Sequence, residues 1–226
     1  MSELVFESEI GTFPSHWRVE RVDKLFTIQQ GKQVSKRTRR GDNQRPFLRT
    51  KNVYWCRLDL GELDHLHFSV QDEIRLELLP NDLLVCEGGD VGRTALWNGE
   101  VERCYFQNHL HRLRVINADE VLAEFGMYWF WYAFELGKVY FGRGNKTTIP
   151  NLSKSRLGEL QIPCPPIDEQ EKIVLFLSNL QRSADLHEAI YKDRRELQES
   201  LTSKIISAQI DISGLNLDLL KIKNEG

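Results

Sequence analysis

The spacing of hydrophobic and polar positions changes twice along the chain. Up to about residue 116, apolar residues stand in short β-type runs separated by turn residues, as in PFLRTKNVYW, NDLLVCEGG, RTALWNG and NHLHRLRVI. Residues 117–138 are then apolar on nearly all sides, which predicts a buried helix with Asn117 as candidate N-cap and Gly137 near its end. The first two patterns together predict a globular domain that mixes strands and helices.

The third pattern begins after IPCPP, whose prolines stop the preceding element and favour a stiff, extended link. Residues 167–210 contain no Pro or Gly, and their apolar positions recur mostly at intervals of three and four, which predicts one long helix. At about 1.5 Å per residue this helix is roughly 60 Å long, more than one compact domain covers. Its apolar stripe therefore predicts an antiparallel coiled coil with a partner helix. The predicted contact residues are Ile173, Phe176, Leu177, Leu180, Ala184, Ile190, Leu197, Leu201 and Ile205.

The chain is thus expected to have an α+β fold in which a long helix follows a mixed α/β domain. Within that domain, residues 13–28 predict a short strand or helix, and the basic loop FGRGNKTT leads to a short helix capped by Asn151 or Ser153. The expected parts are a loose leader at 1–12, the globular domain at 13–166, the spacer helix at 167–210 and a loosely held tail at 211–226.

Composition is that of a globular protein, with 41% hydrophobic and 28% charged residues among 226. No run approaches 18 apolar residues, and MSELVFESEI lacks the pattern of a signal peptide, so we expect a cytoplasmic protein without a membrane partner. The four cysteines are widely spaced and form no C-x-x-C pair. This spacing argues against a zinc site and indicates reduced, mostly packed thiols.

Charge is distributed unevenly, although the net charge is only −3. Residues 32–51 contain eight basic side chains and one acidic side chain, and residues 138–156 contain five basic and no acidic side chains. Residues 168–199 contain eight acidic and five basic side chains. A locally concentrated positive charge favours phosphate binding more than the summed charge opposes it.

Four segments supply candidate DNA contacts, namely the loop FGRGNKTT and three others that each have a plainer alternative. GKQVSKRTRRGDNQRPFLRTKN is either a solvated loop or a surface for phosphates and base edges. EGGDVGR is neither a Walker loop nor a dinucleotide fingerprint, and we interpret it as a tight turn that presents Arg93 outward. In QNHLHR a strand explains the two histidines better than a metal site does. The predicted DNA-binding residues are Lys36, Arg37, Arg39, Arg40, Arg49, Lys51, Arg93, Gln107, Asn108, His109, Arg143, Asn145, Lys146, Thr147 and Thr148.

Catalytic signatures are missing from the sequence. It has no [DN]-P-P-[FYW] tetrad for amino methylation, no Walker pair, no H-E-x-x-H and no G-x-S-x-G. The series Glu169-Gln170-Glu171-Lys172 weakly resembles a nuclease E-x-K, but it lies on the predicted structural helix. We therefore expect a protein that is not an enzyme and that needs no cofactor or metal.

Several motifs resemble one known family. IPCPPIDEQEKIV is similar to the P-x-P-P-x-x-E-Q-x-x-I junction of type I restriction–modification specificity subunits. FPSHWRVERVDKLF, FLRTKNV, NDLLVCEGGDVGRTALWNGEV and CYFQNHLHRLRV resemble the target-recognition domain of the same family. The resemblance covers about residues 13–210, and the junction with the EGGD and QNH segments is its most specific part.

This resemblance implies a non-catalytic subunit that chooses the sequence of double-stranded DNA and holds adenine methyltransferase subunits, to which translocase–nuclease subunits can attach. Family members typically carry two recognition domains and two long helices, whereas this chain has one of each. Two copies paired through their helices would read a gapped inverted repeat. The alternatives are a stand-alone coiled-coil regulatory protein and a self-sufficient nuclease. DNA binding that weakens steeply with salt would favour the specificity subunit over the stand-alone coiled-coil protein.

Overall fold

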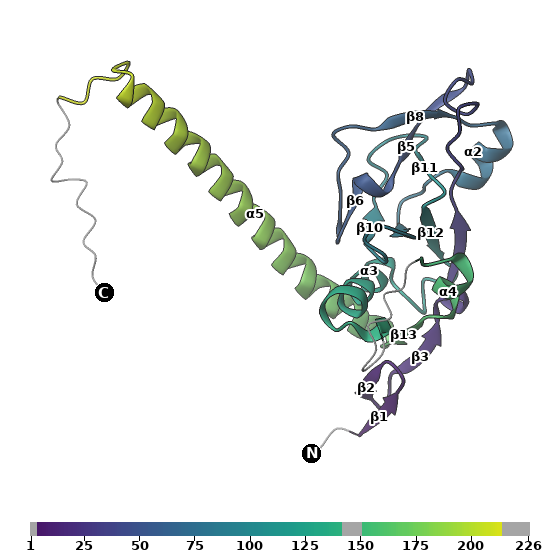
Figure 1. Cartoon of the computed structure of the whole chain (residues 1–226). Helices are drawn as coiled ribbons and strands as arrows, with labels where there is room; N and C mark the ends of the chain where they lie inside the picture. The colour runs from purple at the N-terminus through teal and green to yellow at the C-terminus, as the bar shows by residue number, and fades with distance from the viewer. Residues whose placement is uncertain (1–3, 142–150, 214–226) are drawn as a thin grey trace. The chain divides into compact units, whose positions relative to one another are not determined.

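The computed structural model describes residues 4–141 and 151–213, in two units that comprise residues 1–175 and 176–226. The α+β fold class is confirmed (Figure 1). The strands are β1 (Val5–Ser8), β2 (Gly11–Pro14), β3 (Arg18–Arg21), β4 (Phe26–Gln30), β5 (Gln44–Leu48), β6 (Val53–Tyr54), β7 (Arg57–Leu58), β8 (Asp64–His67), β9 (Asp82–Cys86), β10 (Thr94–Trp97), β11 (Tyr105–Phe106), β12 (Leu110–Val115) and β13 (Gln161–Cys164). The helices are α1 (Val22–Leu25), α2 (Val70–Leu76), α3 (Ala123–Trp131), α4 (Lys154–Glu159) and α5 (Ile167–Ile206), with 3-10 turns at Thr50–Asn52 and Val139–Phe141.

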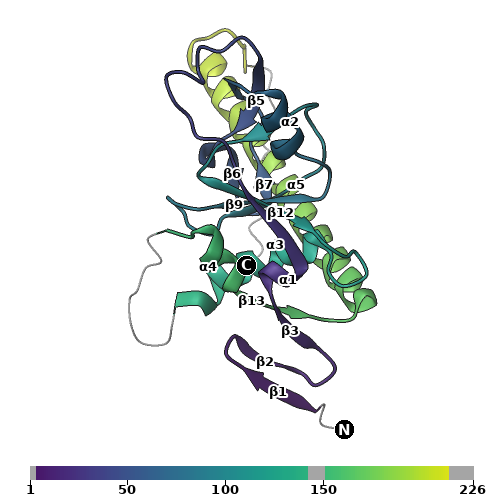
Figure 2. The same ribbon diagram turned by 90° about the vertical axis from the view of Figure 1, so that its right-hand side faces the viewer.

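Two sheets organise the first unit. An antiparallel sheet has the order β10-β9-β12-β4, and a second sheet has the order β11-β5-β8, in which β11 runs parallel to β5. All five residues of β9 are buried, because β9 is an inner strand and α3 packs against it and β10. Figure 2 shows β9 and β12 crossing the middle of this unit.

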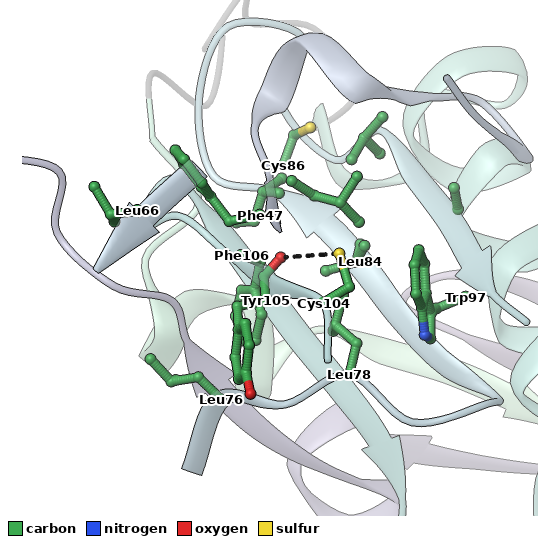
Figure 3. Close-up of a cluster of buried hydrophobic side chains, with 14 of the residues drawn as sticks. Phe47, Leu66, Leu76, Leu78, Leu84, Cys86, Trp97, Cys104, Tyr105 and Phe106 are labelled. Carbon is green, nitrogen blue, oxygen red and sulfur yellow. Dashed lines mark hydrogen bonds between the residues drawn. The ribbon is translucent and has the colours of Figure 1, made fainter. Parts of the chain in front are cut away.

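A cluster of buried side chains connects the two sheets (Figure 3). The rings of Phe68 and Tyr105 stack with their centroids 4.3 Å apart, and Trp97 is fully buried. Burial raises the pKa of the Cys104 thiol to about 12, so this thiol stays protonated in the core. The expectation of reduced, packed thiols is confirmed, since all four cysteines are free and three of them are buried.

The N-terminal segment is not the loose leader that the sequence suggested. Strands β1 and β2 form an antiparallel hairpin that pairs Val5 with Pro14 and Ser8 with Gly11. The ring of Phe13 stacks on Trp17 at 5.9 Å and meets the edge of Trp129 at 6.1 Å. Aromatic contacts to the following domain therefore order a stretch whose own sequence carries only weak β periodicity.

The predicted buried helix is present, but it begins later than Asn117. Helix α3 starts at Ala123 after Leu122, which makes no side-chain cap, and continues as a π-helix over Tyr132–Leu136. The Asn117 side chain instead accepts a hydrogen bond from the Asp119 backbone, which holds a local turn. Local hydrogen bonding thus removed Asn117 from the helix, whereas the other predicted cap, Ser153, does accept a bond from the Arg156 N–H at the start of α4.

The first turn of α5 is fixed to the first unit by Gln170, which is fully buried. Its amide nitrogen donates to the carbonyls of Glu120 and Pro165, both at 2.9 Å, and its amide oxygen accepts from the Leu122 N–H at 2.9 Å. All three partners are backbone groups, so loss of this side chain would leave them unpaired in the interior. The E-Q dipeptide of the junction motif therefore has a structural explanation.

Glu169 also belongs to this attachment rather than to a catalytic site. Its carboxylate accepts from the Trp17 indole N–H at 2.8 Å and contacts the His16 ring at 2.7 Å. Lys172 pairs instead with Asp168 at 3.1 Å. Glu169 and Lys172 thus have separate partners on a structural helix, which gives the resemblance to a nuclease E-x-K a structural explanation.

The second unit, residues 176–226, contains the rest of α5. The whole helix has 40 residues, or about 60 Å, and it ends four residues before the predicted limit at 210. Its apolar side chains are largely uncovered within the chain, with exposed fractions of 65% for Phe176, 54% for Leu180 and 59% for Leu197. The described helices, α5 included, offer no stretch with the length and hydrophobicity of a membrane span.

The capping box of α2 makes a testable contribution to acid stability. Burial raises the pKa of the Asp72 carboxyl, but hydrogen bonds from Lys32 (2.5 Å) and Ser69 outweigh burial and hold the pKa at about 2. Because the folded pKa lies below that of an unfolded aspartate, the stabilisation is present above about pH 4 and is lost as the pH falls towards 2. We expect Asp72→Asn to lower the free energy of unfolding by up to about 2 kcal/mol at pH 7.

Urea unfolding at several pH values checks this expectation. The difference between wild type and Asp72→Asn should shrink as the pH falls from 5 to about 2.5. Glu62→Gln, at an exposed position, is the control and should follow wild type throughout. A constant difference across this range would contradict the assignment.

Candidate nucleic-acid interface

The loop between β4 and β5, residues 31–43, is called the basic loop and is held by its own side chains. Ser35 and Thr38 exchange backbone-to-hydroxyl hydrogen bonds at 2.9 and 3.2 Å, and the Arg39 N–H donates to the Ser35 carbonyl at 3.1 Å. The Thr38 carbonyl accepts from the His67 N–H on β8 at 2.9 Å. The loop is therefore a series of defined turns attached to the edge of a sheet.

Four cations of this loop form no ion pair with the described residues. The side chains of Lys36, Arg37, Arg39 and Arg40 belong to exposed residues, and none of them forms an ion pair with a described residue. Side chains that are charged, exposed and unpaired are available to phosphates without first breaking an internal contact.

Three other cations of the same sequence segment have structural partners. Lys32 pairs with Asp72 at 2.5 Å and Arg45 pairs with Glu73 at 2.5 Å. Arg49, which the sequence placed among the DNA contacts, pairs with Asp64 at 2.7 Å. The structure thus divides one uniform basic segment into cations that hold the fold and cations that remain free.

Asp64 shows that the free cations of two loops lie near each other. Its pKa is lowered first by the hydrogen bond from Arg49, against the effect of burial, and further by the charges of Lys51 and Arg39. Arg39 comes from the basic loop, and Lys51 from the 3-10 turn after β5. Lys51 is exposed and has no carboxylate within ion-pair distance in the described part of the chain. Arg39 and Lys51 thus both lie close enough to Asp64 for their charges to act on it. The unpaired cations Lys36, Arg37, Arg39, Arg40 and Lys51 are together called the cationic surface.

Arg93 is not presented outward as the sequence suggested. EGGDVGR does form the tight turn between β9 and β10, but the Arg93 side chain is only 17% exposed and folds back onto the protein. It pairs with Asp90 at 2.8 Å, donates to the Thr50 carbonyl at 3.1 Å and lies over the Tyr54 ring at 5.4 Å. Gly92 permits this turn, since its φ is +85° and a Cβ there would lie 2.4 Å from the Phe134 ring.

Sequence reasoning missed one cation beside this turn. Arg57 at the start of β7 is exposed, and its guanidinium lies 5.2 Å from the Tyr54 ring centroid. A cation on an aromatic face keeps its charge available to an anion. In the sequence, Arg57 follows Tyr54 closely in the series Tyr-Trp-Cys-Arg. This series is typical of an ordinary hairpin turn, so it did not indicate a cation held on an aromatic ring.

The Gln107–His109 turn precedes β12, as predicted, but its three side chains differ in access. Gln107 is buried, with only 6% of the residue exposed, whereas the His109 side chain is 62% exposed. The turn is fixed by backbone bonds from Leu110 to Gln107 (3.0 Å) and from Asn108 to Lys32 (2.9 Å). Gly31 is required opposite it, because a Cβ would lie 2.2 Å from the Gln107 carbonyl oxygen. His109 and Asn108 remain candidates for base contacts, and Gln107 is the least accessible of the three.

His111 has a structural role in place of metal binding. It is fully buried in β12, its Nε2 contacts the Leu152 carbonyl at 2.9 Å, and burial lowers its pKa. Within residues 4–141 and 151–213, no group of three His, Cys, Asp or Glu side chains is placed to hold a metal ion. The predicted contacts Arg143, Asn145, Lys146, Thr147 and Thr148 lie outside the described residues.

Most of the predicted contact residues on α5 are exposed within the chain. Ile190 is 38% exposed and Leu201 is 41% exposed, and Phe176, Leu180 and Leu197 are exposed as described above. The remaining predicted positions are Ala184, which is exposed, and Ile173, Leu177 and Ile205, which are half-buried. An apolar series of this length on a surface helix is typical of a protein-binding face.

Known proteins share this architecture. Residues 14–193 match the model of the type I restriction modification DNA specificity domain. A putative type I restriction enzyme specificity subunit (MjaX) of Methanocaldococcus jannaschii is 22% identical over 178 residues, which cover 76% of this chain and 41% of that protein. The chain therefore spans less than half the length of this curated relative.

Solved structures agree at the level of the fold. One chain from a structural study of complex assembly and conformational transition of a type I R-M system has a TM-score of 0.61 and 23% identity, covering 83% of this chain and 44% of that one. The HsdS subunit from Thermoanaerobacter tengcongensis has a TM-score of 0.57 and 23% identity, covering 85% and 45%. The S subunit from M. genitalium has a TM-score of 0.57 and 20% identity, covering 85% and 46%.

Proposed function

Because this chain belongs to the family of type I restriction modification DNA specificity domains, we propose that it is the non-catalytic subunit that selects the DNA sequence for an adenine methyltransferase complex in the cytoplasm. The observation that carries the proposal is the cationic surface, whose members Lys36, Arg37, Arg39, Arg40 and Lys51 are exposed and form no ion pair with a described residue. Residues 13–166 act as the target-recognition domain, and residues 167–210 act as the spacer.

The exposed apolar side chains of α5 support a second part of the proposal. Two copies pair their α5 helices antiparallel about a two-fold axis, and each copy supplies one recognition domain. A symmetric dimer reads an inverted repeat, and the spacer leaves a gap between the two half-sites. Methyltransferase subunits dock on the pair, and translocase–nuclease subunits attach to them. No cofactor is assigned to this chain.

The methylome of cells that carry the gene tests the proposal. Adenine methylation is mapped with the gene intact and with the gene deleted, while the methyltransferase is expressed in both. We expect one gapped palindromic motif to lose its methylation on deletion. Loss at an asymmetric bipartite motif would keep the specificity role and overturn the homodimer. An unchanged methylome would overturn the specificity role and favour the stand-alone coiled-coil protein.

A further inference from the structure

Glu87 carries a largely buried carboxylate for which the described residues provide few hydrogen-bond donors. Its side chain is 11% exposed, and only one of its oxygens has a partner among the described residues. Oε2 accepts from the Gln30 amide at 3.2 Å and lies 3.9 Å from the His109 ring nitrogen. A carboxylate with little access to water is normally matched by a cation or by several donors, because lost hydration is costly. The 11% of the side chain that stays exposed leaves this carboxylate accessible to a ligand.

The backbone of Glu87, and not its side chain, holds the local structure. Its N–H donates to the His109 carbonyl at 2.9 Å, and its carbonyl accepts from the Leu152 N–H at 2.8 Å. Both bonds would persist with almost any side chain at this position. The carboxylate therefore calls for a different explanation from the turn that contains it.

A cavity of about 780 Å³ supplies the second observation, and its size lies within the range of roughly 300–1,000 Å³ that ligand sites occupy. It lies between β4 and the start of α4, and Glu87 is part of its wall. Besides Glu87, the polar groups around it are an amide, hydroxyls, one ammonium group and a second carboxylate, from Gln30, Thr27, Ser153, Ser155, Lys154 and Asp23. The Asp23 carboxylate already pairs with Arg21 at 2.6 Å. Gln30 also donates to the Asn108 carbonyl at 3.0 Å, which joins the cavity to the Gln107–His109 turn.

The chemistry of a carboxylate limits which chemical groups can bind to Glu87 in the cavity. An ionised carboxylate only accepts hydrogen bonds, and it repels phosphates. On the edges of DNA bases in the major groove, the donors are the exocyclic amino groups of cytosine and adenine. A carboxylate on a DNA-reading surface is therefore selective for a base that presents such an amino group.

We propose that Glu87 determines specificity by accepting a hydrogen bond from the exocyclic amino group of one cytosine or adenine in the target, while Gln30 positions the carboxylate. The inference rests on the proposed function and deepens it. Glu87→Gln keeps the shape of the side chain but adds a donor, so the site then also accepts bases that present an acceptor.

The test replaces Glu87 with Gln in the chromosomal gene and maps adenine methylation. We expect discrimination at one position of each half-site to fall by about 10- to 100-fold, while every other position keeps its preference. The base lost from the requirement, cytosine or adenine, identifies the partner. Glu102→Gln is the matched control, since Glu102 is exposed and forms no ion pair within the described residues, and its motif should equal that of wild type.

Two outcomes would overturn the inference. One is an unchanged motif methylated to the same extent in Glu87→Gln. The other is a uniform decline at all sites together with a lower melting temperature of the purified chain, which indicates a structural role. A motif that disappears on gene deletion but survives Glu87→Gln intact defeats only the role of Glu87. A methylome unchanged by deletion defeats the proposed function itself.

Discussion

Replacing Arg37, Arg39 and Arg40 together with alanine is expected to weaken DNA binding by about 100-fold near physiological salt, because three exposed, unpaired cations are lost. Each phosphate contact releases about 0.9 counterion from duplex DNA. The slope of log K against log salt should therefore become less steep by about 2.7. Binding is measured by fluorescence anisotropy of a labelled duplex from about 0.05 to 0.3 M salt.

The matched control for this variant removes three exposed cations elsewhere in the first unit. Lys24, Arg75 and Arg103 lie outside the basic loop, and their replacement by alanine changes the net charge by the same amount. Arg75 and Arg103 pair with Asp72 and Glu73, so the melting temperature of the control is measured alongside its binding. If phosphates bind the basic loop, the control keeps both the affinity and the salt slope. Equal losses in the two variants would show that only overall charge matters. Salt-independent binding by wild type would contradict a phosphate interface.

The second large effect concerns the exposed apolar face of α5. We expect Leu180→Asp with Leu197→Asp to convert a dimeric chain to a monomer, with a dissociation constant raised by at least about 1,000-fold. Each leucine contributes about 1.5–3 kcal/mol when buried, and the two-fold axis places each substitution in the interface twice. Sedimentation equilibrium of the full chain measures the change.

A charge-matched control on the same helix separates the face from the net charge. Lys192→Gln with Ser203→Asp alters positions two residues beyond Ile190 and Leu201, or about 200° around the helix. This control should dimerise as wild type does. A wild-type chain that remains monomeric on its own would contradict the homodimer and would require a different partner for α5.

The sequence predicted that the segment 32–51 is basic, but it could not show which of its cations belong to the cationic surface. The basic segment predicted a phosphate-binding surface, but nothing in the order of its residues separates Arg39, which is free, from Arg49, which is paired with Asp64. The pairing carboxylates stand far away along the chain, as Asp72 does from Lys32. An ion pair of this kind is a tertiary contact, so only the fold shows which cations remain unpaired.

Glu87 and Arg93 also show that the sequence does not reveal where a side chain points, even where the local structure is predicted correctly. Both belong to a glycine-rich turn that the sequence predicted correctly, and the turn by itself accounts for the motif. Whether a side chain of a turn faces solvent depends on what packs beside it. Thr50 and Tyr54 contact the inward-folded Arg93, and the start of α4 lines the same cavity as Glu87.

The sequence by itself determined the long helix, the proline link, the buried helix α3 and the family, because periodicity, proline geometry and motif spacing act over a few neighbouring residues. Only the tertiary structure decided that residues 5–14 form a hairpin, that Asn117 stays outside α3 and that Gln170 fixes the start of α5. Each of these outcomes depends on partners distant in the chain or on competing hydrogen bonds. Local propensity is too weak to settle them, and the folded packing does.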